Sequence, residues 1–225
     1  VPTRSNDWSR NEIDDFVFAK LADSKLAPSV EADRNTLARR LSLDLTGLPP
    51  SNEELKTFLD DPSPGSYERY VDRLLASPQY GEHMARYWLD VVRYGDTHGL
   101  HLDNYREHWP YRDWIIQAFN ENKPFDEFAT EQLAGDLLPN ATLSQKVATG
   151  FHRAAPFNTE GGTPKEARRT YQVLDRVNVT GTVWLGTTLE CAQCHEHKYD
   201  PFPQEEYYQL LSFFNNTPVE VQKGS

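Results

Sequence analysis

The sequence predicts an all-α fold, an irregular multi-helix domain with long functional loops. Apolar residues recur at spacings of three and four along most of the chain, and helix start and stop signals separate these segments. Runs of alternating polarity, which are typical of strands, are scarce, and we find no internal repeat or low-complexity tract. A length of 225 residues suits a single domain, spanning 1–225, with a substantial core.

Five helices are predicted in the amino-terminal part. Their apolar stripes begin, in chain order, at Ile13, Leu37, Leu55, Tyr67 and Met84. Asp33 is the expected N-cap of the second helix, which the run at 47–50 (Gly-Leu-Pro-Pro) ends. The segment 51–54 (Ser-Asn-Glu-Glu) forms a capping box that opens the third. The fourth helix ends before Pro78, and the fifth is expected from about Glu82.

The helical pattern lapses at 95–109, a polar and histidine-rich loop, and again in a second loop at 154–162. Further helices are expected around Trp114, after Pro124, from about Leu143 to Phe151 and from Tyr207 to Phe214. The sharpest helix start is Thr163 to Glu166, with threonine as N-cap and proline at the first helical position. The β-branched run 177–183 is expected to fray this helix or to shift it toward strand.

The most informative motif is the run Cys191-Ala192-Gln193-Cys194-His195. Two cysteine thiols three residues apart can form thioethers with the two vinyl groups of a haem, and the following histidine can coordinate the iron. Cys191 and Cys194 are the only cysteines of the chain, so none remains for a structural disulfide. The motif predicts one covalently attached haem c, with His195 as the proximal iron ligand.

Three other interpretations of the motif stay open. Zinc could recruit both cysteines with one or both of His195 and His197, although structural zinc sites usually take a second ligand pair from a distant hairpin. A thiol-exchange pair expects a βαβ context, which the sequence lacks. The two cysteines and the histidine could also be incidental neighbours. We favour haem, because the adjacent histidine completes the attachment motif.

The charge of the chain restricts its partners. A formal net charge of −11 and a pI near 5.1 argue against nucleic acid and against an anionic membrane surface. No stretch approaches the length of apolar sequence that spans a bilayer. Because covalent haem attachment normally takes place outside the cytoplasm, we expect a periplasmic or otherwise exported protein. Its leader is not recognisable at 1–4, and both ends resemble cuts within a longer multidomain protein.

The ligand on the opposite face of the iron is the open question. His197 lies too close to His195 to reach that face, so we expect it to contact the haem edge or to support the ligand. Met84 lies in an apolar helix stripe, which favours core packing. His98 and His152 belong to the two long loops or border them, and are the distal-ligand candidates. Bis-histidine ligation would indicate electron transfer, whereas an open position would permit small-molecule or peroxide chemistry.

Weaker signals accompany the motif. If the sixth position is open, three residues are candidates for polarising a bound molecule: Arg153, Tyr94 and Asp96. A calcium site would draw on Asp90, Asp96, Asp103 and Glu160, which lack any specifying spacing. A sugar-stacking platform would use Trp109, Trp114 and Tyr111, although aromatic residues at helical spacing more often form core.

Several blocks of the chain together resemble a known family. Besides the haem segment 191–201 (CAQCHEHKYDP), they are 31–34 (EADR), 43–50 (LDLTGLPP), 131–138 (EQLAGDLL), 160–162 (EGG) and 175–177 (DRV). In this order they resemble the planctomycete secreted cytochrome-type domain family, the second cytochrome-like domain of that group, catalogued without an assigned function. The resemblance implies a haem-bearing domain of large exported proteins, between a smaller cytochrome domain and a further uncharacterised one. Where relatives often have histidine or asparagine around 151–155, this chain has His152 and Ala155.

The sequence therefore predicts an exported c-type cytochrome domain that carries electrons within a larger oxidoreductase. Its expected partners are neighbouring domains of the same protein and a redox partner protein, to which an acidic face could present a docking surface. Two alternatives remain: a haem enzyme with an open sixth iron site acting on a small molecule or carbohydrate, and a carbohydrate-binding or interaction module.

Overall fold

The all-α fold is confirmed by a computed structural model, which describes residues 6–100, 102–156, 158 and 164–217. These residues form ten α-helices and, in place of strands, a single isolated bridge between Thr97 and Tyr105. The α-helices are α1 (Glu12–Asp23), α2 (Arg34–Thr46), α3 (Asn52–Leu59), α4 (Ser66–Leu75), α5 (Pro78–Val91), α6 (Trp109–Asn120), α7 (Phe125–Ala134), α8 (Leu143–Ala148), α9 (Lys165–Thr180) and α10 (Gln204–Asn215). Short turns of other helix types are η1 (Gly135–Leu137), η2 (Thr149–Arg153), η3 (Gly181–Leu185) and η4 (Glu190–Gln193).

Local capping explains most helix boundaries. The Asp33 carboxylate accepts the Thr36 N–H at 3.0 Å and begins α2, while Ser51 and Glu54 form the predicted capping box of α3. Helix α5 begins at Pro78, four residues before the predicted start at Glu82, because Ser77 serves as its N-cap. Helix α9 begins at Lys165 with Pro164 in the N-cap position, and the predicted cap Thr163 lies outside the described residues.

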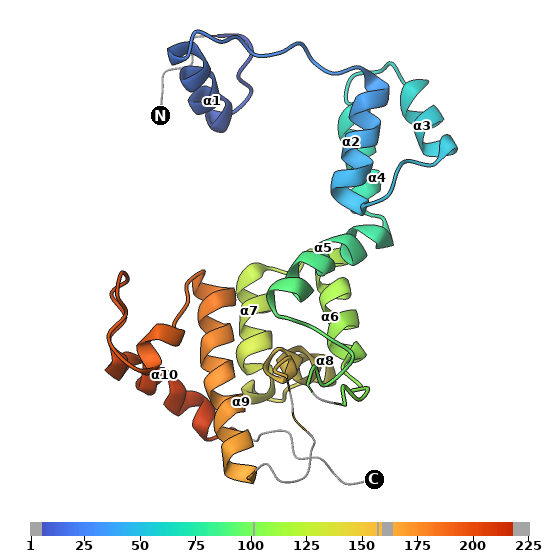
Figure 1. The fold of residues 1–225 in the computed structure, drawn as a ribbon. Helices are drawn as coiled ribbons and strands as arrows, with labels where there is room; N and C mark the ends of the chain where they lie inside the picture. Colours follow the sequence, from blue (N-terminus) through green and yellow to red (C-terminus); the bar gives the residue numbers. More distant parts are fainter. Residues whose placement is uncertain (1–5, 101, 157, 159–163, 218–225) are drawn as a thin grey trace.

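Helix α1 stands apart from the remainder of the chain, to which an extended segment joins it (Figure 1). The predicted helix is confirmed, yet its apolar side faces outward: Ile13 is 73% exposed and Phe16 55%. The helix is therefore held by its capping box rather than by burial of its apolar stripe, since Asn11 and Asp14 satisfy its first N–H groups.

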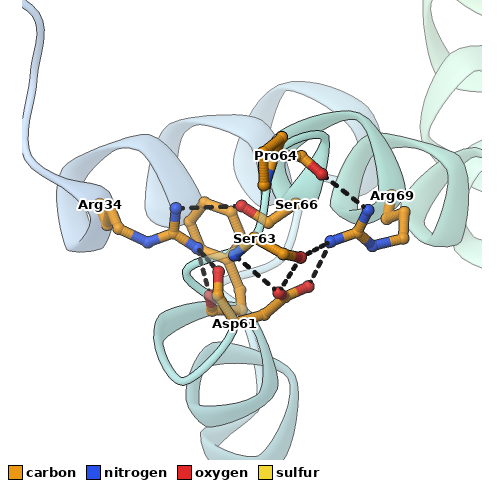
Figure 2. A network of polar contacts seen from close by, with 7 residues as sticks. Arg34, Asp61, Ser63, Pro64, Ser66 and Arg69 are labelled. Carbon is orange, nitrogen blue, oxygen red and sulfur yellow. Dashed lines mark hydrogen bonds and ion pairs between the residues drawn. The ribbon is translucent and has the colours of Figure 1, made fainter.

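Helices α2, α3 and α4 enclose a small core of their own, formed by Ala38, Phe58, Tyr70 and Leu74. One arginine holds the turn between α3 and α4 (Figure 2): the Arg34 guanidinium donates to the Asp61 carbonyl at 3.0 Å and to the Ser66 hydroxyl at 3.1 Å. On the other side of this turn, Arg69 donates to the Asp61 carboxylate at 2.6 Å. Hydrogen bonds from Arg69 and Ser63 hold the pKa of Asp61 well below its ordinary value.

The main core lies among α5, α6, α7 and α8, and α9 borders it. Tyr111 and Trp114 are buried in this core, which confirms the favoured expectation of core packing for these two residues, whereas Trp109 is 46% exposed. Tyr111 donates to Gln132 Oε1 at 2.6 Å, and Trp88 donates to the same oxygen at 3.0 Å, which satisfies these buried polar groups.

A second core joins α9, η4 and α10, and it positions the cysteine motif. The β-branched run 177–183 neither frays α9 nor becomes a strand, because Val177 belongs to the second core and Val179 to the main core. The helix continues to Thr180 and passes into the π-helical turn η3. Helix α9 thus packs against both cores, with α10 and η4 on the side away from α7 (Figure 1).

Candidate haem-binding site

The motif forms a tight turn that brings its three functional side chains to the surface. The carbonyl of Cys191 accepts the N–H groups of Cys194 and His195, each at 3.4 Å. Cys191 lies in η4 and Cys194 is its C-cap, and side chains three residues apart nearly eclipse in a 3-10 helix, so the two thiols are expected on one side of the turn. Both cysteines are free and exposed, as is His195. The turn thus offers two thiols and an imidazole together to a ligand.

Two apolar residues hold this turn against the protein. Leu189 is 5% exposed and Ala192 is fully buried, both in the core formed with α9 and α10. Beside them lies a hollow of about 200 Å³, lined by Leu185, Leu189, Ala192, Phe202, Glu206, Tyr207 and Leu210. Its mostly apolar walls suit one edge of a large flat macrocycle, and Ala192, which follows Cys191 in the motif, is one of them.

Helix α10 fastens the carboxyl side of the turn. The carbonyl of Gln193 accepts two hydrogen bonds, from the Tyr208 hydroxyl at 2.9 Å and from Gln204 Nε2 at 3.1 Å. The Glu196 carboxylate accepts the backbone N–H of Gln204 at 3.1 Å, which places a negative charge at the amino end of α10. These contacts fix the backbone on both sides of Cys194, so the two thiols keep a fixed relative position.

The hydrogen bond of His195 sets its tautomer. Its Nδ1 lies 2.7 Å from the carbonyl oxygen of Glu196, and a carbonyl only accepts, so Nδ1 carries the hydrogen. The Nε2 atom of the neutral ring is then left with its lone pair, the state in which imidazole binds a metal. The Glu196 carbonyl thus orients the His195 ring through the nitrogen that would not bind the iron.

His197 supports the same loop from within. Its side chain is 6% exposed, and its Nδ1 accepts the backbone N–H of Asp200 at 2.9 Å and that of Tyr199 at 3.4 Å. Its own backbone N–H donates to the Phe202 carbonyl at 3.0 Å, and the two rings pack edge to face. His197 therefore organises the loop 197–202 behind the motif, as a group that accepts backbone hydrogen bonds.

The phenol of Tyr207 closes the inner side of the hollow. It donates to Asn178 Oδ1 at 3.1 Å, and burial raises the pKa of Tyr207 to about 12. Tyr207 is therefore neutral at physiological pH and acts as a hydrogen-bond donor between α10 and α9. Residues of α10 such as this one, Gln204 and Tyr208 were missed by the sequence analysis. Their only signal is polar groups interleaved with the apolar stripe of the last helix.

His152, one distal-ligand candidate, lies in η2 between the two cores. Its Nε2 donates to the Leu133 carbonyl at 3.0 Å, and its ring packs against Phe151 and Phe214. Burial lowers the pKa of His152, so the ring is neutral. The Nδ1 lone pair is buried and has no hydrogen-bond partner among the described residues. Phe214 also belongs to the core that anchors the motif.

The other predicted site residues lie in the segment between α5 and α6 and at the end of η2. His98 is buried, and its backbone N–H donates to the Asn104 carbonyl at 2.9 Å. The Tyr94 hydroxyl donates to the Asp96 carboxylate, and burial together with this carboxylate raises the pKa of Tyr94. Arg153 is exposed. These residues belong to elements other than the cysteine turn.

The donor groups of the turn are those that a c-type haem uses. Within the described ranges, no three or more His, Cys, Asp or Glu side chains gather as a metal site would require, which also leaves the calcium set without support; its member Glu160 lies outside those ranges. A c-type haem requires only what the turn offers: two exposed thiols, an imidazole with a free Nε2 and an adjoining apolar hollow. No helix in the part of the chain described here is long and apolar enough to cross a membrane.

Fold and site together define an all-α domain that displays a Cys-x-x-Cys-His turn at its surface. Residues 12–219 match the model of PSCyt2, a family described as a protein of unknown function (DUF1549). The chain belongs to this family. Searches of curated proteins and of solved structures found no match.

Proposed function

We propose that this chain is a c-type cytochrome domain that transfers electrons within a larger exported oxidoreductase. Cys191 and Cys194 would form the two thioethers to a single haem c, and His195 would be its proximal ligand. Such a haem supplies a one-electron redox centre. The protein contributes the attachment turn, the axial imidazole and the apolar hollow beside Leu189.

The observation that carries this proposal is the state of His195 within the motif. The carbonyl of Glu196 holds Nδ1 in its protonated form, which directs the Nε2 lone pair to a ligand while both thiols are exposed on the same turn. A thiol-exchange pair has no need of this imidazole, and His197, the candidate fourth ligand of a structural zinc site, uses its Nδ1 to accept two backbone N–H groups. Covalent haem attachment uses all three groups.

For the distal position we propose His98 or His152. If His152 is the ligand, coordination would use Nδ1, because Nε2 donates to the Leu133 carbonyl and the buried Nδ1 lacks a partner among the described residues. The same hydrogen bond supports a second candidate function, a haem enzyme with an open sixth position, because it holds the His152 ring through the nitrogen that most often binds metals.

The proposed setting follows from the attachment chemistry. Thioether formation to haem belongs to export compartments, so we place the domain in the periplasm or outside the cell. Its partners would be neighbouring domains of the same protein and a redox partner protein. Electrons would reach or leave the haem at its exposed edge, beside the cysteine turn.

Expression with an export signal, in a host that matures c-type cytochromes, tests the proposal. Intact-mass analysis should show one added haem, and the pyridine haemochrome spectrum should show two thioethers. Either single variant, Cys191→Ala or Cys194→Ala, should lower the attached fraction and shift that spectrum to that of one thioether. The double variant should carry no covalent haem, and bare polypeptide from the wild-type chain would refute the proposal.

The ligation state separates the two functions. A low-spin spectrum that carbon monoxide does not alter indicates two protein ligands and electron transfer, whereas a high-spin ferric form indicates an open position. His152→Ala and His98→Ala identify the ligand, because only loss of the true sixth ligand converts a low-spin haem to high spin. His83→Ala, on a partly exposed histidine of α5, is the matched control.

A further inference from the structure

A second pocket, remote in sequence from the cysteine turn, opens between α5, the end of α6, the turn that follows it, and α7. It encloses about 270 Å³. Five aromatic side chains line it: Tyr80, Trp88, Phe119, Phe125 and Phe128. Its remaining walls are Ala118 and two polar residues, Asn122 and Lys123. No residue of this lining belongs to the hollow beside the motif, so occupancy of the pocket does not depend on a haem.

The aromatic walls suit a flat ligand. The rings of Trp88 and Phe128 meet at 71°, and their centroids lie 4.8 Å apart. The ring centroids of Phe119 and Phe128 lie 5.8 Å apart. Ring faces and edges at these angles pack well against another planar ring. The indole N–H of Trp88 already donates to Gln132 at 3.0 Å, so this wall presents carbon surface rather than a donor.

Lys123 gives the pocket its polar specificity. Its ammonium lies 3.0 Å from the Glu131 carboxylate, and both side chains are largely buried, at 19% and 11% exposure. Lys123 is part of the pocket lining, and because an ammonium has three N–H donors, its ion pair with Glu131 leaves donors for a ligand. Because Glu131 neutralises the charge, an anionic ligand gains little, whereas a neutral carbonyl oxygen can accept a charge-assisted hydrogen bond.

The volume limits the size of the ligand. A cavity of about 150 Å³ holds one benzene ring, so this pocket accommodates two fused rings. We propose that the pocket binds a neutral, planar, bicyclic aromatic carbonyl compound, with its rings against Trp88 and Phe128 and its carbonyl oxygen toward Lys123.

Three probes of matched size test this proposal by titration calorimetry on the full chain. Chromone has the neutral carbonyl, naphthalene lacks an acceptor, and 1-naphthoate is an anion. Chromone should bind about tenfold more tightly than naphthalene, the usual effect of a hydrogen bond to a charged donor. 1-Naphthoate should bind no more tightly than chromone. Equal affinities for chromone and naphthalene, or a preference for the anion, would overturn the proposal.

Paired variants locate the binding. Phe125 is 69% exposed at the rim, so Phe125→Ala should weaken chromone and naphthalene alike without unfolding the chain. Phe213→Ala, at 74% exposure on α10, is the matched control and should change neither affinity. Equal effects of the two substitutions would exclude the pocket as the binding site.

A double variant tests the polar contact. Lys123→Met combined with Glu131→Gln removes the ammonium without leaving a buried carboxylate unpaired. It should reduce the preference for chromone over naphthalene to less than about twofold. Lys146→Met, on an exposed lysine of α8, should leave the preference unchanged. A preference that survives in the double variant would refute the role of Lys123.

Discussion

Packing between Gly181 and Leu189 controls the position of the cysteine turn, and a single added methyl group tests this. Gly181 is buried at the start of η3, and a Cβ built on it lies 2.6 Å from Leu189 Cγ and 2.7 Å from Cδ1. These separations are far below a van der Waals contact. Leu189 is 5% exposed and precedes Cys191 by two residues, so Gly181→Ala must displace the residue that anchors the motif.

The expected magnitude follows from two opposing effects. Overpacking a core by one methyl group costs about 1–3 kcal/mol, and alanine recovers about 0.5–1 kcal/mol over glycine in a helix. We therefore expect Gly181→Ala to lower the free energy of unfolding by up to about 2.5 kcal/mol. Leu189→Ala alone should cost about 2–5 kcal/mol through lost burial and a cavity. In that background the methyl group enters vacated space, so Gly181→Ala should become neutral or stabilising.

A double-mutant cycle on the haem-free chain measures this change of sign. Urea unfolding gives the free energies, and amide hydrogen exchange of α9 shows that the effect is local to the core that α9 shares with Leu189. Gly95→Ala is the control, because the nearest atom that its added Cβ would meet is the backbone nitrogen of Thr97, 4.0 Å away. It should leave stability within about 0.5 kcal/mol of wild type, or raise it.

The result that would refute this reasoning is an equal cost of Gly181→Ala in both backgrounds. Such a result would mean that the added methyl group does not act through Leu189. A second readout is the yield of covalent haem, which Gly181→Ala should lower if the thiols depend on the position of Leu189. Unchanged yield with lowered stability would separate folding from attachment.

Two further predictions concern histidines. His197→Ala removes the acceptor of two backbone N–H groups and should loosen the loop 197–202, at a cost of about 1–2 kcal/mol; His197→Asn retains an acceptor and should recover about half. For His152, burial lowers the pKa in the folded state, so the unfolded chain takes up a proton first as pH falls. Stability should therefore fall by up to about 1.4 kcal/mol from pH 7.5 to 5.5, and His152→Gln should remove that part of the slope.

Amide hydrogen exchange at Tyr199 and Asp200 checks the prediction for His197, because the N–H groups of these two residues donate hydrogen bonds to His197 Nδ1. Equal protection in His197→Ala and wild type would contradict it. Urea unfolding at several pH values checks the second. A pH slope that is unchanged in His152→Gln would show that other groups account for it, and that His152 titrates alike in both states.

Local sequence predicted the helices well because the responsible contacts span only three or four residues. The Asp33 cap, the box of Ser51 and Glu54 and the break at Gly47, whose φ is +70°, all act within one helical turn. The late start predicted for α5 has the same origin, because Pro78, which marks the end of α4 in the sequence, is also the first residue of the next helix, capped by Ser77.

Burial and side-chain roles were less predictable, because contacts between distant residues determine them. The stripe of α1 has the same spacing as the buried stripes, yet Ile13 is exposed since no other helix covers it in the described chain. Helix α6 turns Tyr111 and Trp114 into the main core, as their spacing suggests, but leaves Trp109 of the same helix 46% exposed. Spacing identifies an amphipathic helix without identifying what it packs against.

The cysteine motif combines both cases. Its spacing alone places two thiols on one turn, and the structure gives that turn as η4. Its fixed position depends on residues far from it. Gly181 leaves space for the Leu189 side chain. Tyr208 and Gln204 donate hydrogen bonds to the Gln193 carbonyl. None of these has a recognisable motif. Five consecutive residues thus supply the reactive groups of the site, whereas α9 and α10 determine its geometry. Substitutions in those two helices should therefore alter the proposed haem attachment without changing a haem ligand.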